Sequence, residues 1–280
     1  MEKSMNKGHC RIDDLDWSLL EGRNWGAMRW KEVFNEERFG SREFVFGYGE
    51  LDPGAAQPLH THKQTETIYI MAGQAKVRLG ARSIEIGPDS AAIFPAGMPH
   101  SIQVLGGEAL RFMATYATEK QGQDVGAIPA DEAAATKVDF VNGRFTRWAV
   151  AEEFDDWIPI EPSKGRKSMC VRLLVGGGTE LGKELRGGTC LLPVGAHYTR
   201  HFHDQAEIYV GLSGRGIVYV GDEAVEVTPG TAIYLGSRVP HGADTVGDEP
   251  FRMYWLYGME STGESFNWTP VEDTYTEARG

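Results

Sequence analysis

The chain has 280 residues, 41% of them hydrophobic, which is enough for two domains that each bury a core, so a disordered or fibrous protein is excluded. The formal net charge is -12 and no basic cluster occurs, so we expect neither a nucleic acid nor a membrane as a partner. The 35 glycines and 13 prolines are spread through apolar stretches without a long amphipathic helical pattern, and this mixture favours an all-β fold of short strands and tight turns.

Residues 1–39 are predicted to form an N-terminal arm. Charged residues interrupt it throughout, so it holds neither the apolar core of a signal peptide nor a membrane-spanning segment, and we expect a cytoplasmic protein. The arm contains Trp17, Trp25 and Trp30, three of the 7 tryptophans of the chain. This density of aromatic side chains predicts that the arm packs on a following domain or on a partner subunit, and the second arrangement would make the protein a homodimer.

Residues 40–120 are predicted to form a first β domain. Residues 67–71 (TIYIM) are β-branched and aromatic, as strand residues commonly are, and Gly73 closes the segment at a turn. Further on, AKVRLG and SIEIG alternate apolar and polar residues with period two, which predicts a hairpin. Short antiparallel strands at this spacing are typical of a sandwich or a small barrel.

The remaining segments predict a linker, a second β domain and a tail. Residues 121–145 are polar and alanine-rich, and Pro129 precedes the run ADEAAATK, so we expect a linker with a short helix. Residues 146–260 return to strand patterns, for example IYV at 208–210, and residues 261–280 follow as a C-terminal tail. The three cysteines have no metal-ligand or redox spacing, and we expect free thiols at Cys10, Cys170 and Cys190.

The two β domains are an internal duplication. The segment GAAQPLHTHKQTETIYIMAG from Gly54 and the segment GAHYTRHFHDQAEIYVGLSG from Gly195 share both terminal glycines, both histidines and the glutamate. Each shared residue of the second segment lies 141 positions after its counterpart, as His201 does after His60. The same spacing continues through a third pair of histidines into LRFMATYA and FRMYWLYG. One ancestral domain was therefore copied.

Six of the 8 histidines fall at matching places in the two repeats, each set with one glutamate. Residues two apart on a strand point to the same face, so each His-x-His pair presents two imidazoles to one interior. Three imidazoles and one carboxylate form a donor set that divalent transition metals accept. We therefore predict two metal sites, formed by His60, His62, Glu66 and His100 and by His201, His203, Glu207 and His241.

The same ligands are compatible with several metals. Fe2+ and Mn2+ are the expected ions, and Zn2+, Ni2+ and Cu2+ stay open, because cellular supply decides among metals that one donor set accepts. A metal held by four protein ligands keeps room for water or a small-molecule substrate.

The walls of the two predicted sites differ. Ile68 and Ile70 share the face of Glu66, so the first site is expected to be apolar beyond its ligands. In the second repeat Tyr209 shares the face of Glu207, and a phenol beside a metal can act as a general acid, a base or an oxyanion donor. We therefore expect the second site to be the more reactive, unless Tyr209 only fills the core.

Four further residues are predicted to bind the substrate. Tyr198 and Arg238 lie near the histidines of the second site in sequence, and an arginine can hold a carboxylate through two contacts. Gln57 and Gln103 lie near the first site, where an amide can orient a ligand or a water molecule. Solvated loop residues would explain the arginine and the glutamines equally well.

Both histidine-rich segments resemble the first motif of the cupin family: a glycine, five residues, His-x-His, three residues, a glutamate, six residues and a glycine. The second cupin motif, a glycine, five residues and Pro-x-Gly-x-x-His, fits less well. Asp89 replaces its leading glycine in the first repeat, and Gly236 and Arg238 replace its proline and second glycine in the second repeat. The resemblance implies a bicupin, two tandem cupin barrels (double-stranded β-helix, or jelly-roll) with a short helical linker.

Bicupins with complete ligands in both halves resemble bacterial quercetinase-type dioxygenases and the oxalate decarboxylase group. That second group carries an arginine three residues before its first histidine, where Gln57 and Tyr198 stand here, which disfavours oxalate as the substrate. The resemblance implies a metal-dependent oxidoreductase, a dioxygenase acting on a small chelating enol, hydroxy-carbonyl or hydroxy-acid substrate, with Glu66 or Glu207 as a catalytic base.

Two alternatives to a dioxygenase stay open. A redox-neutral lyase or isomerase would use the metal to polarise a carbonyl while Tyr209 removes a proton. The pairing of Glu207 with Tyr209 resembles cupin lyases acting on dimethylsulfoniopropionate, and a sugar isomerase is another form of this alternative. The other alternative is a non-enzymatic protein that binds a small molecule.

Overall fold

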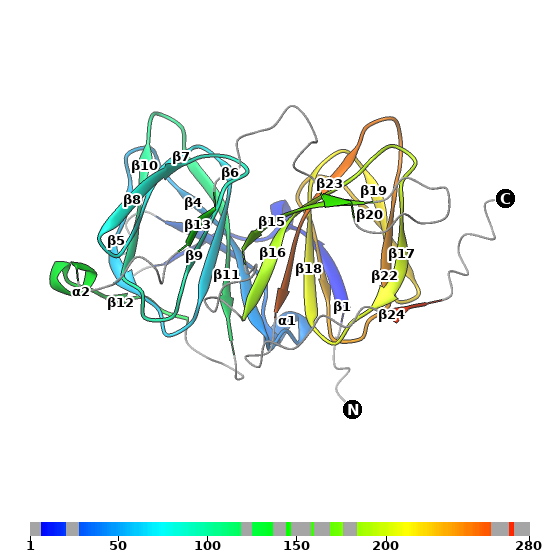
Figure 1. The fold of residues 1–280 in the computed structure, drawn as a ribbon, viewed down its shortest axis with the longest axis horizontal. Helices are drawn as coiled ribbons and strands as arrows, with labels where there is room; N and C mark the ends of the chain where they lie inside the picture. The colour runs from blue at the N-terminus through cyan, green and yellow to red at the C-terminus, as the bar shows by residue number, and fades with distance from the viewer. Residues whose placement is uncertain are drawn as a thin grey trace.

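The computed structural model describes residues 7–20, 28–118, 125–136, 144–146, 158–159, 169–175, 184–258 and 269–271. These residues form two β barrels that lie side by side (Figure 1). Each barrel consists of a seven-stranded and a five-stranded sheet. The predicted all-β fold with two tandem barrels is confirmed.

In the first barrel, the strands that carry the predicted ligands lie inside both sheets rather than at their edges. The seven-stranded sheet has the order β13 (Arg144–Thr146), β9 (Ala91–Phe94), β6 (Glu66–Ala72), β11 (Leu110–Ala117), β4 (Phe44–Leu51), β3 (Arg29–Phe34) and β2 (Ser18–Leu19). The five-stranded sheet has the order β12 (Ile128–Pro129), β5 (Ala56–Thr61), β10 (His100–Leu105), β7 (Gln74–Leu79) and β8 (Arg82–Ile86).

The second barrel repeats this topology strand for strand. Its seven-stranded sheet has the order β1 (Lys7–Arg11), β21 (Thr231–Leu235), β18 (Ala206–Ser213), β23 (Phe251–Gly258), β16 (Leu185–Leu192), β15 (Cys170–Val175) and β14 (Ile158–Pro159). Its five-stranded sheet has the order β20 (Glu223–Val227), β19 (Gly216–Val220), β22 (His241–Thr245), β17 (His197–Phe202) and β24 (Thr269–Pro270).

The seven-stranded sheets are buried on both faces. In β6, Ile68 and Ile70 belong to the core of the first barrel, whereas Tyr69 between them belongs to a second apolar cluster that lies between the barrels. In β23 the same alternation sends Trp255 into the second barrel and Tyr254 into the cluster between the barrels. Burial on both faces explains why these strands are continuous apolar runs in the sequence.

Aromatic and charged contacts join the barrels. The rings of Tyr69 and Tyr254 lie 5.0 Å apart between centroids. Beside them Arg252 donates from Nη2 to Oδ1 of Asp89 at 3.0 Å, and Tyr69 donates its hydroxyl to the same carboxylate. The two seven-stranded sheets are therefore held together by directional contacts as well as by apolar area.

The two barrels exchange their first strands. In the N-terminal arm, β1 pairs with β21 of the second barrel, whereas β2 and β3 continue the sheet of the first barrel. In turn β13, which directly precedes the second β domain, pairs with β9 of the first barrel. The domain boundaries predicted from the sequence did not anticipate this exchange.

The tryptophans of the arm hold it against the first barrel. Trp30 is buried in that barrel's core. Trp17 packs on Tyr48 with 5.9 Å between ring centroids, and the Lys31 ammonium lies 4.8 Å from the centre of the Trp17 ring. Trp25 lies outside the described residues.

Helices are few and short in the described part of the chain: α1 (Glu36–Phe39), α2 (Glu132–Thr136) and the 3-10 turn η1 (Ile12–Asp14). The predicted linker helix is α2, and it begins after Asp131, whose Oδ1 accepts a hydrogen bond from the N–H of Ala134 at 2.7 Å. None of these described helices approaches the length needed to cross a lipid bilayer. The three cysteines form no disulfide, as predicted.

The departures from the second cupin motif leave its backbone unchanged. Asp89 has a φ of 61°, close to the 81° of its counterpart Gly230, and Arg238 has a φ of 61°, close to the 74° of Gly97. The N–H of Arg238 donates to the carbonyl of His203 at 2.8 Å, as the N–H of Gly97 does to the equivalent carbonyl of the first repeat at 2.7 Å. Both repeats therefore keep this turn despite the substitutions. Asp89 and Arg238 adopt the left-handed conformation there, although it is costly for residues with a side chain.

Candidate metal centres

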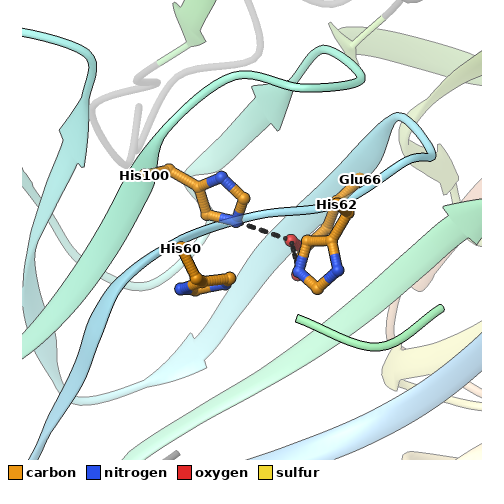
Figure 2. A group of neighbouring side chains, drawn as sticks. All are labelled: His60, His62, Glu66 and His100. Atoms are coloured by element: carbon orange, nitrogen blue, oxygen red, sulfur yellow. Dashed lines mark hydrogen bonds and ion pairs between the residues drawn. The ribbon is translucent and has the colours of Figure 1, made fainter. Parts of the chain in front are cut away.

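Four side chains of the first barrel meet in its interior, as Figure 2 shows. His60 lies on β5 and His62 directly follows that strand, while Glu66 begins β6 and His100 begins β10. His60 and His100 are cross-strand partners. One ligand atom from each of the four residues lies within 4.8 Å of the others, and all four side chains are buried. The structure thus brings the predicted ligands of the first site together.

Glu66 connects two of the three histidines. Its Oε2 lies 3.2 Å from Nε2 of His62 and 3.0 Å from Nε2 of His100, the two contacts drawn as dashed lines in Figure 2. The ring of Phe94 stacks on His100, with 4.2 Å between centroids and 7° between planes. Ile68 and Ile70 lie in the core of this barrel, as the strand alternation predicted, and the Tyr116 ring also approaches the centre, 5.0 Å from His62.

Backbone carbonyls orient the imidazoles of all six predicted ligands. Nδ1 of His60 lies 2.7 Å from the carbonyl oxygen of Pro58, and Nδ1 of His100 lies 2.7 Å from that of Met98. Because a carbonyl only accepts, Nδ1 carries the proton and a neutral ring keeps its lone pair on Nε2. The same contact is made by His62 with Gly126, His201 with Thr199, His203 with Gln205 and His241 with Val239.

Burial and contacts among the four side chains shift the pKa values of the first centre. Burial lowers the pKa of His60 to about 3, and the neighbouring His100 adds to the effect. Burial by itself would raise the pKa of Glu66, but His62 and His100 hold that pKa well below its usual range. For His62, Glu66 outweighs burial and raises the pKa. The centre therefore offers an ionised carboxylate next to a neutral imidazole.

The second barrel brings its three histidines together in the same way, and Glu207 contacts two of them. Its three histidines place one ligand atom each within 4.8 Å of the others, and His201 pairs with His241 across β17 and β22. Oε2 of Glu207 lies 3.1 Å from Nε2 of His203 and 3.1 Å from Nε2 of His241. Burial would raise the pKa of Glu207, but the hydrogen bonds with these two histidines lower it to about 2. For His201, burial lowers the pKa to about 2.

Phenols surround the second centre. The hydroxyl of Tyr198 lies 3.2 Å from Nε2 of His201, and the hydroxyl of Tyr257 is hydrogen-bonded to Glu207. The ring of Tyr209 lies 6.0 Å from that of His241. Burial, reinforced by the Glu207 carboxylate, raises the pKa of Tyr209 and of Tyr257 well above the usual phenol value. Tyr209 and Tyr257 therefore keep their protons at neutral pH and can act as hydrogen-bond donors.

Tyr257 is a site residue that reasoning from the sequence missed. Its ring lies 4.9 Å from that of His203, and its counterpart Tyr116 lies 5.0 Å from the ring of His62. A signal was present, because the 141-residue spacing pairs the two tyrosines and strand alternation puts Tyr257 on the same face as other core residues of β23. The pairing of β23 with β18, which brings Tyr257 opposite Glu207, was not visible in the sequence.

The four predicted substrate residues lie in different environments. Tyr198 is buried at the second centre, and Gln57 is buried in the first barrel, where its amide donates to Sδ of Met28 at 3.0 Å. Gln103 is exposed, because it lies on the face of β10 opposite to His100. Arg238 is also exposed, stacked over the ring of Phe202 and paired with Asp204 at 3.1 Å. A role in substrate binding stays a prediction for all four residues.

The chemistry of both donor sets fits a divalent metal ion. Six imidazoles donate Nδ1–H to backbone carbonyls, and four of them place Nε2 next to the buried, ionised glutamate of their centre. Histidine ligands in metal sites are commonly oriented by this second hydrogen bond. Three nitrogen donors and one carboxylate suit Fe2+, Mn2+ or Zn2+. The residues that would hold the ions are the eight predicted ligands.

A family model for the cupin domain matches residues 47–116 and 188–257, which together make up half of the chain. Among curated proteins, an uncharacterised protein of Methanocaldococcus jannaschii is 34% identical over 77 residues, 26% of this chain and 62% of that protein. Oxalate decarboxylase of Bacillus subtilis is 42% identical over 60 residues, 20% of this chain and 16% of that enzyme. Glucose-6-phosphate isomerase of Pyrococcus furiosus is 35% identical over 69 residues, 22% of this chain and 36% of that enzyme. Each match spans less than two thirds of the relative's length.

Solved structures of oxalate decarboxylase share the fold over nearly the whole chain. Two of them, one a variant of the B. subtilis enzyme, have a TM-score of 0.65 at 18% identity and cover 97% of this chain and 83% of theirs. A third, of the B. subtilis enzyme and its Mn(II) centres, has a TM-score of 0.64 at 17% identity. At this low identity the likeness shows the shared fold of two barrels and nothing more.

Proposed function

This chain belongs to the cupin family and carries the cupin domain twice, and on that premise we propose that it is a metal-dependent enzyme whose chemistry takes place in the second barrel. The substrate class that suits the site is a small molecule with two adjacent oxygen atoms, such as a hydroxy acid or a hydroxy-carbonyl compound, because such a pair chelates a metal beside its protein ligands. The observation that carries the proposal is the contact of two phenols, Tyr198 and Tyr257, with the ligands His201 and Glu207.

The reaction that this geometry favours is redox-neutral, a lyase or isomerase reaction. A divalent metal ion, when bound, would polarise the substrate oxygens and stabilise negative charge that develops on them. Glu207 is ionised and can receive a proton from the substrate at its carboxylate. Tyr198 and Tyr257 keep hydroxyl protons next to the same ligands and can donate to a substrate oxygen as charge develops.

Two relatives support a redox-neutral reaction. The names of oxalate decarboxylase and glucose-6-phosphate isomerase describe a lyase and an isomerase rather than an oxygenase. The Mn(II) centres of B. subtilis oxalate decarboxylase support Mn2+ as one of the two metals expected here. Oxalate itself stays disfavoured, because Gln57 and Tyr198 stand where that group has a substrate-binding arginine.

A dioxygenase, which the sequence led us to expect first, is the second candidate. The first barrel favours it, since Phe94 stacks on the ligand His100 and belongs to one apolar core with Ile68 and Ile70, and apolar surroundings suit a nonpolar gas molecule. In that case Glu66 would be the base that activates the substrate.

One experiment separates the two candidates. The protein is loaded with Mn2+ or Fe2+ and incubated without oxygen in D2O with hydroxy acids, keto acids and aldoses, and deuterium uptake into carbon-bound positions is measured by NMR. We expect anaerobic turnover with deuterium uptake, and loss of both in Glu207→Gln. Oxygen consumption without any anaerobic turnover would instead establish the dioxygenase and overturn the redox-neutral proposal.

A further inference from the structure

The second barrel holds a hydrogen-bond donor that neither metal centre uses. Trp255 lies on β23 two residues before Tyr257, and its side chain is 7% exposed. The indole Nε1–H is buried and has no hydrogen-bond partner within the described part of the chain. An indole N–H only donates, and leaving a donor unpaired in a barrel core is costly. Such a group points to a ligand that supplies the missing acceptor.

The register of two strands places this donor next to the second metal centre. Glu207 pairs with Tyr257 across β18 and β23, and Tyr209 pairs with Trp255 one step further along the same two strands. Both members of the second pair belong to the core of the second barrel. Two residues along a strand cover about 7 Å, so the Tyr209–Trp255 pair lies about 7 Å along the strands from the Glu207–Tyr257 pair. This distance is comparable to the length of a small molecule.

Ring contacts tie this pair to the metal ligands. The ring of Trp255 lies 5.0 Å from that of Tyr257, which in turn lies 4.9 Å from the ring of His203. On the other side of the pair, the ring of Tyr209 lies 6.0 Å from that of His241. The indole and the phenol therefore each lie next to a ring that belongs to the second centre or contacts one of its ligands.

The first barrel provides an internal comparison. At the positions equivalent to Tyr209 and Trp255 it has Ile68 and Ala114, which are paired across β6 and β11 in the same way. Neither side chain can form a hydrogen bond. Two donors therefore distinguish the second barrel from the first at one matching pair of positions.

We propose that Trp255 Nε1–H and the Tyr209 hydroxyl bind a carbonyl oxygen of the substrate, at the end of the molecule remote from the metal, and thereby select substrates that carry this oxygen. The inference rests on the proposed function, in which the second barrel binds a chelating substrate at a metal. An uncharged oxygen is expected because both donors are neutral, and a buried anion would need a charged partner.

The test compares two probes that differ only in this oxygen. Both 2-hydroxy-4-oxopentanoate and 2-hydroxypentanoate carry the same chelating head, but only the first has a carbonyl near the far end. Their dissociation constants are measured by calorimetry with protein loaded with Zn2+ in both centres. We expect the oxo probe to bind the second barrel about tenfold more tightly, which is the effect of one or two hydrogen bonds to a buried ligand. The first barrel, with Ile68 and Ala114, should bind both probes equally.

Trp255→Phe should bring the ratio of the two dissociation constants to about one. The matched control is Trp30→Phe, which alters a buried tryptophan of the first barrel and should leave the ratio unchanged. A second measurement, the Tm of the metal-free protein, detects a purely structural role. Trp255→Phe and Trp30→Phe both remove part of a buried ring and should lower the Tm by similar amounts, whereas a clearly larger loss for Trp255→Phe would show that Nε1–H already serves the fold.

The outcomes separate this inference from the proposed function. If metal analysis finds no Zn2+ in the second barrel after loading, the proposed function fails and the inference fails with it. If the metal is bound and the wild-type protein does not prefer the oxo probe, or if Trp255→Phe keeps the preference, the inference alone is overturned.

Discussion

The Tyr198 hydroxyl lies 3.2 Å from Nε2 of His201, the atom through which that histidine would bind a metal. The equivalent residue of the first barrel is Gln57, whose amide donates to Met28 Sδ instead. The two centres thus share their histidines and glutamates but differ in the group beside the first histidine. A phenol can donate a proton during a reaction, and this difference supports our proposal that the chemistry takes place in the second barrel.

Replacing Tyr198 by phenylalanine should lower turnover without removing the metal. Loss of a general acid commonly costs about 10²–10⁴-fold in rate, so kcat should fall by at least about 100-fold while the metal content of the second centre stays the same. Steady-state kinetics and metal analysis of the same sample check both parts. Tyr219→Phe is the matched control, because it removes a tyrosine hydroxyl of the second barrel that donates to Asp244 at 2.8 Å. Equal losses in the two variants would contradict a specific role for Tyr198.

Single histidine substitutions should empty one centre each. His60→Ala and His201→Ala remove one of three nitrogen donors from the first and the second centre, so each variant should bind about one metal ion per chain where the wild-type protein binds two. Elemental analysis after dialysis measures the stoichiometry. Activity should be lost with His201→Ala and largely kept with His60→Ala. The reverse pattern would move the chemistry to the first barrel.

Arg238 should tolerate glycine and resist a β-branched residue. Its φ of 61° is the conformation that glycine adopts freely, so Arg238→Gly should be neutral or stabilising by up to about 1 kcal/mol, whereas Arg238→Val should destabilise by about 1–2 kcal/mol. Urea unfolding measures both changes. Arg238→Gly is expected to keep the fold, so the KM of this variant also tests the predicted role of Arg238 in substrate binding. An unchanged KM would show that the arginine contacts Asp204 and Phe202 at the surface and does not bind the substrate.

The metal-free protein should lose stability below about pH 6.5. The pKa of His60 is lowered to about 3 and that of His201 to about 2, both from 6.5. Between these values the unfolded chain binds more protons than the folded chain, so the free energy of unfolding falls as the pH falls through this window. The raised pKa of His62 adds stability as the pH falls towards 6.5 and opposes the loss only above that pH; below it His62 is protonated in both states and leaves the trend unchanged.

From pH 6.5 to 5.5 the two histidines together should cost about 2 kcal/mol, as measured by urea unfolding in the presence of a chelator. Metal-loaded protein should lose less over the same range, because the ions bind the neutral imidazoles. A flat profile for the metal-free protein would contradict the lowered pKa values.

Much of the fold was predictable because the sequence repeats one domain and because the ligand spacing lies within short segments. The histidine-rich segments occupy a strand, a turn and the start of the next strand, so their spacing alone predicted that His60, His62 and Glu66 converge. Strand alternation likewise predicted the apolar wall formed by Ile68 and Ile70. Gln103 shows the limit of proximity in sequence: it lies three residues after His100 but on the opposite face of β10.

The sequence by itself determined two barrels and two matching sets of metal ligands, because these features depend on spacings within short segments that one backbone geometry governs. Only the tertiary structure decided that Tyr257 meets Glu207, that Trp255 stands beside Tyr209, and that β1 and β13 cross between the barrels. Those contacts depend on the register of strands that lie about 50 or more residues apart, and register is set by the packing of whole sheets rather than by any local pattern.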